Sequence, residues 1–355
     1  MTRRGSGLTQ DPARDTAGAT IDTGRAPAEP PSVAALLERD GVGRRSFLQW
    51  CGFIAGVLAL PADPFGERIA HALTTQPRLP VLWLNGQDCN GNIEGFLRAS
   101  DPTPSELVLD RLSIDYVELL MAPSGTAAEN QRADTIARFA GRYVLVVEGS
   151  VPTAGDGAFC CIGGKAFTQV VEEAAGDALA VIGVGSCAFD GGLPAARGGV
   201  TGAVGIREFL SGSGKTIITL PGCPMNVDNL TATLVHYLTF GTWPELDELG
   251  RPEFAYGSCV HELCDRRRHY RAGRFVLEWG DEGHQQGWCL LKMGCLGPGT
   301  PANCPTARFN SGTSWPVASG APCLGCTRPK FWDNLSRAFP AAPASSSSSS
   351  SSQGT

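Results

Sequence analysis

Short apolar runs alternate with longer amphipathic stretches between residues 79 and 237. Five runs have the length of buried strands, and Gly, Pro and Asp stand at many of their ends. The predicted strands cover residues 81–84, 114–119, 143–147, 180–184 and 216–220. Helical periodicity over residues 128–140 and 167–175 separates the second, third and fourth strands. This βα repetition predicts an α/β fold with a parallel sheet.

The pattern changes beyond residue 238. Residues 239–338 are rich in Gly, Pro, Trp and Cys, and few segments keep a regular apolar period. We therefore expect no conventional core there, and we expect bound metal clusters to cross-link the region. Residues 339–355 contain an uninterrupted serine run, which predicts a disordered tail. No apolar segment follows that run, so we expect no transmembrane anchor in this chain.

The first 72 residues have the organisation of an export leader. Residues 1–43 lack sustained periodicity and are expected to be disordered. The paired arginines Arg44 and Arg45 precede a short apolar run, which resembles a twin-arginine signal peptide. The segment Ala70-His71-Ala72 has the form of a cleavage site and puts the mature start near Leu73. The predicted location is the periplasm, or the extracytoplasmic face of the membrane.

Composition narrows the possible functions. The chain has 355 residues, 42% of them hydrophobic and 18% charged, which is typical of a globular protein. Its net charge of -6 means that the chain has no excess of positive charge for binding phosphates, so we expect no nucleic acid partner. Thirteen cysteines fall below the density of a short disulfide scaffold. Export by the twin-arginine route implies cofactor loading in the reducing cytoplasm, which favours metal-bound thiolates over disulfides.

Three cysteines each follow a predicted strand. Cys89 comes after the first strand, Cys187 after the fourth and Cys223 after the fifth. In a parallel sheet ligands bind beyond the carboxyl ends of the strands. We therefore expect the three thiols to meet at one edge of the sheet.

A second concentration of metal-ligand residues occupies the last hundred positions. Its members are His261, Cys264, Cys289, Cys295, Cys304, Cys323 and Cys326. The first four combine three thiolates with one imidazole, which suits zinc or an iron-sulfur cluster. The last three lack an obvious fourth thiolate and fit a three-iron cluster better than zinc. Spacing alone favours clusters and leaves zinc open.

The segments around these residues resemble the small subunit of nickel-iron hydrogenases. They include Gly185-Ser186-Cys187-Ala188, Pro221-Gly222-Cys223-Pro224, Val260-His261-Glu262-Leu263-Cys264, Gly294-Cys295-Leu296-Gly297-Pro298 and Pro322-Cys323-Leu324-Gly325-Cys326. The resemblance extends over most of the mature chain. It implies a flavodoxin-like domain over residues 73–238 with a proximal cluster, followed by a loop-rich iron-sulfur domain over residues 239–338.

The resemblance also implies the role of each ligand. The distal 4Fe-4S cluster would be held by His261, Cys264, Cys289 and Cys295, and the medial 3Fe-4S cluster by Cys304, Cys323 and Cys326. Pro316 stands where a fourth medial cysteine would otherwise be. Cys89, Cys187 and Cys223 match three ligands of a proximal 4Fe-4S cluster beside the nickel-iron site of the large subunit. No catalytic residue is expected in this chain itself.

One position departs from the family pattern. Members usually have CxxC after the first strand, whereas Asn92 occupies the place of the fourth proximal thiolate here. The cluster then needs another ligand, or it contains three irons. Asp88 is favoured over Asn92, because it adjoins Cys89 and its carboxylate can replace the missing negative charge. Cys160 and Cys161 are further options, although we expect both to be buried thiols.

These features imply a hydrogenase heterodimer. The large subunit would oxidise hydrogen, and this chain would pass the electrons through three clusters to a membrane cytochrome or another acceptor. A stand-alone exported iron-sulfur carrier is the main alternative. A disulfide-stabilised binding protein is the third.

Overall fold

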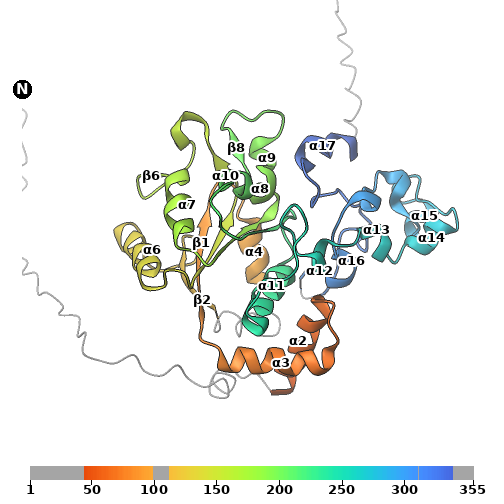
Figure 1. The fold of residues 1–355 in the computed structure, drawn as a ribbon. Helices are drawn as coiled ribbons and strands as arrows, with labels where there is room; N and C mark the ends of the chain where they lie inside the picture. Colours follow the sequence, from red (N-terminus) through yellow and green to blue (C-terminus); the bar gives the residue numbers. More distant parts are fainter. Residues whose placement is uncertain (1–43, 99–111, 311, 339–355) are drawn as a thin grey trace, which may run out of the picture. The chain divides into compact units, whose positions relative to one another are not determined.

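The computed structural model describes residues 44–98, 112–310 and 312–338, all within one compact unit (Figure 1). Five parallel strands form its main sheet, in the order β2-β1-β3-β7-β9. They are β1 (Leu79–Asn85), β2 (Leu112–Val117), β3 (Val144–Glu148), β7 (Ala180–Val184) and β9 (Ile217–Leu220). The order is that of a flavodoxin-like sheet. All five predicted strands are confirmed, although β2 ends two residues earlier than expected.

Helices cover both faces of the sheet, so the strands consist of nearly continuous aliphatic runs. One face packs on α4 (Gly91–Arg98) and α11 (Val227–Phe240), through residues such as Trp83 and Ile182. The other packs on α6 (Thr126–Arg138) and α7 (Phe167–Gly176), through Leu84 and Val181. Figure 1 shows these two helical layers on either side of the strands. Helices α6 and α7 confirm the two helical predictions.

Short elements build the edge where the strands end. They are β4 (Val151–Pro152), η1 (Ala154–Gly157), β5 (Cys161–Ile162), β6 (Lys165–Ala166), α8 (Gly185–Asp190), α9 (Gly192–Ala195), β8 (Ala203–Val204) and α10 (Ile206–Phe209). Strand β4 pairs with β8, and β5 pairs with β6. Helix α8 begins directly at the end of β7, which places Cys187 at this edge.

The chain beyond α11 folds into short helices joined by loops. They are α12 (Glu253–Tyr256), α13 (Val260–Leu263), α14 (Arg267–Arg271), α15 (Glu282–Gln285), η2 (Leu290–Met293), η3 (Gly297–Gly299), α16 (Cys304–Ala307) and α17 (Phe331–Ala338). A small apolar cluster of six buried residues, including Val276, Leu290 and Trp315, lies among them. The expectation of no conventional core is therefore wrong for this region. The cluster is small, however, and Cys264, Cys295, Cys304 and Cys323 pack against it.

Residues 44–75 form two helices, α2 (Arg44–Val57) and α3 (Ala62–Thr75). They pack on each other and on α11, where the ring centroids of Phe65 and Phe240 lie 6.2 Å apart. The predicted cleavage point lies within α3, and Leu73 is buried there. No single described helix has the length and apolarity to cross a membrane, although α2 and α3 pass that test as a pair bent by 115°. The segments predicted to be disordered, residues 1–43 and 339–355, lie outside the described residues.

A buried carboxylate, Glu148, ties the strand ends to the loops beyond them. It is the last residue of β3 and is 0% exposed. Its Oε1 accepts hydrogen bonds from the backbone N–H of Asn92 at 2.8 Å and from Asn92 Nδ2 at 3.0 Å. Its Oε2 accepts from the backbone N–H of Ile93 and from Trp83 Nε1, both at 3.2 Å. Asn92 Oδ1 in turn accepts from the backbone N–H of Met225 at 2.8 Å. Strands β1 and β3, helix α4 and the loop after β9 are thus joined by one network.

Replacing this carboxylate by an amide is expected to destabilise the protein. In Glu148→Gln an NH₂ group would face N–H donors that now have an acceptor. A buried donor left without an acceptor costs about 1–3 kcal/mol. We expect the midpoint of thermal unfolding of the purified protein to fall by several degrees. Glu173→Gln is the control, because the Glu173–Lys165 ion pair is exposed and such pairs contribute about 0–1 kcal/mol. Equal midpoints for the two variants would contradict the role given to Glu148.

Candidate iron-sulfur centres

The three cysteines that follow strands come together at the carboxyl edge of the sheet. The pKa of Cys187 is raised to about 11, first by burial and then by the nearby negative charges of Cys89 and Asp88. The pKa of Cys223 is raised to about 12, by loss of solvent around its sulfur and by the charges of Cys326, Cys187 and Cys89. This proximity matches the expectation from the strand order. The assignment of these thiols as proximal ligands stays a prediction.

The side chain of Asn92 is held by hydrogen bonds to other parts of the protein. Both ends of its side-chain amide are bonded, Nδ2 to Glu148 and Oδ1 to the backbone of Met225. The residue is 8% exposed, and a Cβ added at Gly185 would lie only 2.4 Å from its Nδ2. An amide held in this way has no free oxygen directed at the cysteines. This geometry therefore disfavours Asn92 as the fourth ligand of the proposed proximal cluster.

Asp88 lies at the same edge and has a carboxyl oxygen with only weak contacts. Its Oδ1 accepts from the backbone N–H of Asn90 at 2.6 Å, whereas its Oδ2 is 3.4 Å from Asn85 Nδ2. The pKa of Asp88 is raised to about 6, mainly by burial and then by Glu148. Among the other options, Cys160 is half-buried and Cys161 is exposed. The interpretation of both as buried thiols is thus wrong for Cys161.

The three predicted medial ligands surround one cavity. Burial raises the pKa of Cys304 well above its usual range, and the charges of Cys326 and Cys323 raise it further. Burial also raises the pKa of Cys323 to about 12. The three thiols line a cavity of about 740 Å³ that also contacts Cys223 and Pro316. Pro316 therefore borders the same space as these cysteines.

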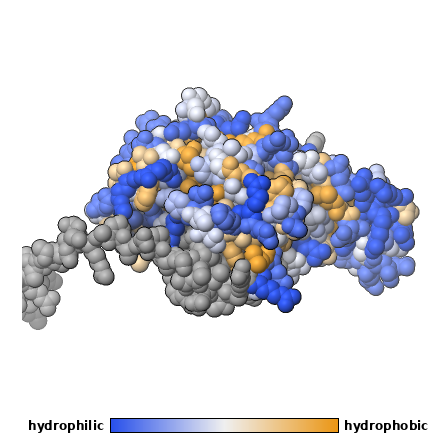
Figure 2. All heavy atoms as spheres, turned by 60° about the horizontal axis from the view of Figure 1, so that its bottom comes forward, coloured by the Kyte–Doolittle hydropathy of each residue, from blue (hydrophilic) through white to orange (hydrophobic). Residues whose placement is uncertain are grey.

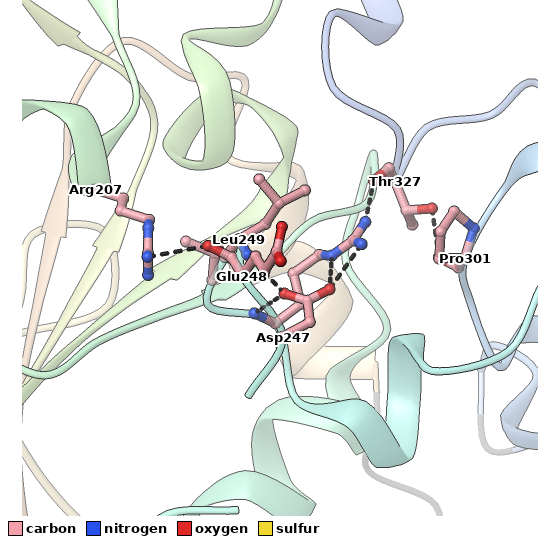
Figure 3. Close-up of polar contacts among 8 residues, drawn as sticks. Arg207, Asp247, Glu248, Leu249, Pro301 and Thr327 are labelled. Atoms are coloured by element: carbon pink, nitrogen blue, oxygen red, sulfur yellow. Dashed lines mark hydrogen bonds and ion pairs between the residues drawn. The ribbon is translucent and has the colours of Figure 1, made fainter. Parts of the chain in front are cut away.

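The loop that carries Cys323 and Cys326 is anchored just beyond them. Figure 3 shows Thr327 between two partners: its hydroxyl donates to the carbonyl of Pro301 at 2.7 Å, and its own carbonyl accepts from Arg251 at 3.3 Å. Arg251 is itself held by Asp247, with a nitrogen-oxygen distance of 2.7 Å. These contacts fix the position of the cysteine loop relative to the segment after α11.

The predicted distal ligands lie around α13 and the loops that pack on it. Burial raises the pKa of Cys264, and the charges of Cys295 and Cys289 raise it further. A Cβ added at Gly297 would lie 3.4 Å from Cys295 Sγ and 3.6 Å from the backbone nitrogen of His261. The pKa of His261 is lowered, first by burial and then by Arg267. The His261 ring meets Tyr270 edge-on, with centroids 4.7 Å apart.

Backbone N–H groups point at several of these sulfurs. Leu193 donates to Cys187, Arg266 to Cys264, Leu291 to Cys289 and Gly325 to Cys323. Hydrogen bonds of this kind tune the reduction potential of clusters bound by thiolates.

Across the described ranges, no group of three or more His, Cys, Asp or Glu side chains is arranged so that it could hold a single metal ion. Thiolate sulfurs with N–H donors around them are the donor set that iron-sulfur clusters use.

The three groups are close neighbours. Cys223 lines the same cavity as Cys304, Cys323 and Cys326, so the first group lies beside the medial group. The N–H of Cys323 donates to Cys295 Sγ at 3.3 Å, so the medial group contacts the distal group. Ser186 Oγ also donates to the carbonyl of Cys326 at 2.6 Å. The group of Cys304, Cys323 and Cys326 therefore lies between the other two.

Sequence reasoning missed the residues that position these ligands. Glu148 ends an aliphatic run, and a carboxylate there is a usable signal for a polar network at a strand end. Tyr270 and Ser186 carry no such signal, because their partners lie far away in the sequence or depend on how short loops fold.

Comparisons with known proteins agree with this arrangement. The family model for the C-terminal part of the NiFe/NiFeSe hydrogenase small subunit matches residues 256–339. The model for the NADH ubiquinone oxidoreductase 20 Kd subunit matches residues 89–237. Among solved structures, a [NiFeSe]-hydrogenase chain from Dm. baculatum has a TM-score of 0.68 at 33% identity, covering 74% of this chain and 98% of that one. An actinobacterial-type NiFe-hydrogenase chain from Ralstonia eutropha H16 has a TM-score of 0.66 at 28% identity, covering 76% and 84%.

Two relatives match over most of their length. The uptake hydrogenase small subunit of Azotobacter vinelandii is 45% identical over 301 residues, which cover 85% of this chain and 83% of that protein. The hydrogenase-2 small chain of Escherichia coli K12 is 44% identical over 292 residues, covering 82% and 78%. This chain therefore belongs to the family of nickel-iron hydrogenase small subunits.

Proposed function

We propose that this chain is the electron-transferring small subunit of an exported nickel-iron hydrogenase that oxidises hydrogen. The observation that carries the proposal is the proximity of three ligand groups: Cys223 lines one cavity with Cys326, and the N–H of Cys323 donates to Cys295 Sγ. Iron-sulfur clusters held by these groups would supply one-electron carriers between a nickel-iron site in a large subunit and an external acceptor. The order of the groups along this path supports transfer in single-electron steps.

Each group has a proposed occupant. A distal 4Fe-4S cluster would be held by His261, Cys264, Cys289 and Cys295, a medial 3Fe-4S cluster by Cys304, Cys323 and Cys326, and a proximal cluster by Cys89, Cys187, Cys223 and Asp88. The buried thiols must lose their protons to bind iron. The N–H donors that point at them stabilise the resulting thiolates, which offsets part of the cost of burial.

The large subunit is proposed to cover the carboxyl edge of the sheet. Large apolar side chains are exposed on the loops and short helices there: Leu119, Leu120, Phe159, Leu193 and Val200. Val200 is 85% exposed and Leu193 is 57% exposed. Apolar side chains gathered in this way mark a protein interface. A stand-alone carrier would have no use for such a surface beside its first cluster, so this observation favours the heterodimer over that alternative.

Export and the acceptor belong to the same proposal. The paired arginines at the start of helix α2, ahead of its apolar residues, support the twin-arginine route to the periplasmic side of the membrane. A membrane cytochrome or another carrier would then receive electrons beside His261.

Activity is expected only from the complete enzyme. The isolated chain should give no hydrogen-dependent dye reduction, because it lacks a nickel-iron site, whereas co-expression with the large subunit should give full activity. Dye reduction under hydrogen measures both preparations. Full activity from this chain alone would contradict the proposal.

A charge placed in the exposed apolar edge should weaken the heterodimer. We expect Val200→Glu to reduce association with the large subunit by about tenfold or more, since burying an unpaired carboxylate at an interface is costly. Leu277→Glu is the matched control, because Leu277 is 68% exposed but lies between α14 and α15, beyond the sheet domain. Size-exclusion chromatography over a dilution series gives both affinities, and equal values would place the interface elsewhere.

The fourth proximal ligand can be tested by electron paramagnetic resonance of the heterodimer. Asp88→Asn removes a carboxylate oxygen next to Cys89, so we expect the proximal signal to change its shape or to become that of a three-iron cluster. Glu118→Gln is the control, since Glu118 acts on Asp88 electrostatically but is not next to Cys89 in the chain. A proximal signal that Asp88→Asn leaves unchanged would remove Asp88 from the ligand set.

A further inference from the structure

An exposed tyrosine connects the proposed distal ligand to solvent. The Tyr270 ring meets the His261 ring edge-on at 4.7 Å and the Phe275 ring edge-on at 6.0 Å. Tyr270 is nevertheless 42% exposed. It lies on α14, so one short helix presents an aromatic ring both to His261 and to the outside of the molecule.

Arginines surround this tyrosine. Five of them lie between residues 266 and 274, in a chain whose net charge is -6. Arg266 donates to the carbonyl of Trp288 at 2.8 Å, and Arg267 donates to the carbonyl of Glu262 at 3.1 Å. Arg271 and Arg274 are exposed. Among the described residues, no carboxylate lies within ion-pair distance of any of the five guanidinium groups.

Their positive charge reaches His261. Arg267 and Arg271 both lower the pKa of that imidazole electrostatically, against the opposite effect of Glu262. Figure 2 shows strongly hydrophilic residues gathered at the end of the molecule that carries α14 and α15 in Figure 1. The five guanidinium groups therefore gather at the point where electrons would leave, although the exposed carboxylates Glu262 and Asp265 lie beside them in the chain.

We propose that Arg267, Arg268, Tyr270, Arg271 and Arg274 form a docking surface for an acidic electron-carrier protein. This surface, called the α14 surface below, rests on the proposed function, because it needs electrons to arrive beside His261. Arginine and tyrosine are enriched at the energetic centres of protein interfaces. Complementary charge raises the rate of encounter by about 10- to 1,000-fold and fixes orientation.

The electron balance of the transfer is simple. Each hydrogen molecule oxidised in the large subunit yields two protons and two electrons. The electrons leave one at a time beside His261 and Tyr270, and each reduces one molecule of an oxidised one-electron carrier. Two carrier molecules are thus reduced for each hydrogen molecule.

A protein fits this surface better than an anionic membrane does. Leu277 and Trp279 are 68% and 58% exposed next to the arginines, but acidic residues share their loop: Glu278, Asp281 and Glu282. An anionic bilayer would repel those carboxylates, whereas a protein partner can present different charges to different parts of the surface.

Two forms of one carrier test the proposal. Native cytochrome c is basic, and cytochrome c with succinylated lysines is acidic. Binding of each to the assembled heterodimer is measured by surface plasmon resonance, and hydrogen-driven reduction of each is followed by haem absorbance. We expect the acidic form to bind at least about tenfold more tightly at low salt. Raising the salt concentration from about 0.01 M to about 1 M should remove the preference, since the Debye length falls from about 30 Å to about 3 Å.

Charge reversal localises the effect. The double variant Arg271→Glu with Arg274→Glu should lose at least about tenfold in affinity for the acidic form. For each variant heterodimer, the rate of carrier reduction is divided by the rate of dye reduction. Any change in hydrogen oxidation by the large subunit then cancels. The matched control reverses the exposed pair Arg138 and Arg142 on the sheet domain, by the same total charge.

Three results would overturn the α14 surface. They are equal binding of the two cytochromes, an equal loss in the control pair, and binding of vesicles with anionic lipid that depends on Arg271 while cytochrome binding does not. Absence of hydrogen-dependent dye reduction would instead contradict the proposed function, and the binding measurement still decides on the surface in that case.

Discussion

The arrangement of this protein depends on a buried carboxylate at the end of a central strand. Glu148 accepts N–H groups from Trp83, Asn92 and Ile93, and Asn92 passes the connection on to Met225. The loops that carry Cys89 and Cys223 flank these contacts on either side. The positions of two proposed proximal ligands are therefore fixed by hydrogen bonds of the protein and do not depend on iron alone.

The same network accounts for the unusual residue at position 92. The resemblance puts a thiolate ligand at this position, whereas the Asn92 amide joins β3 to the loop after β9. Position 92 thus connects parts of the protein by hydrogen bonds and does not supply the fourth thiolate that the family pattern has there. Asp88 adjoins Cys89 and has a carboxylate at the same edge, and an oxygen ligand would change the electronic character of the proximal cluster.

Much of this could be predicted from the sequence. Aliphatic runs of strand length gave the five strands, and the position of Cys89, Cys187 and Cys223 after strands gave their meeting point, because both follow from local periodicity and parallel topology. Contacts such as Tyr270 with His261, or Cys323 with Cys295, could not be predicted. They depend on short loops, whose course is set by the small apolar core and by single anchors such as Thr327.

The central claim is an ordered series of clusters that accepts electrons from hydrogen. Mössbauer spectroscopy of the iron-57-enriched heterodimer, recorded after oxidation and again under hydrogen, tests it most directly. Three distinct clusters are expected, one of them of the three-iron type, and hydrogen should reduce them. An iron-free small subunit, or clusters that stay oxidised under hydrogen in an enzyme that still reduces dye, would contradict the proposed path.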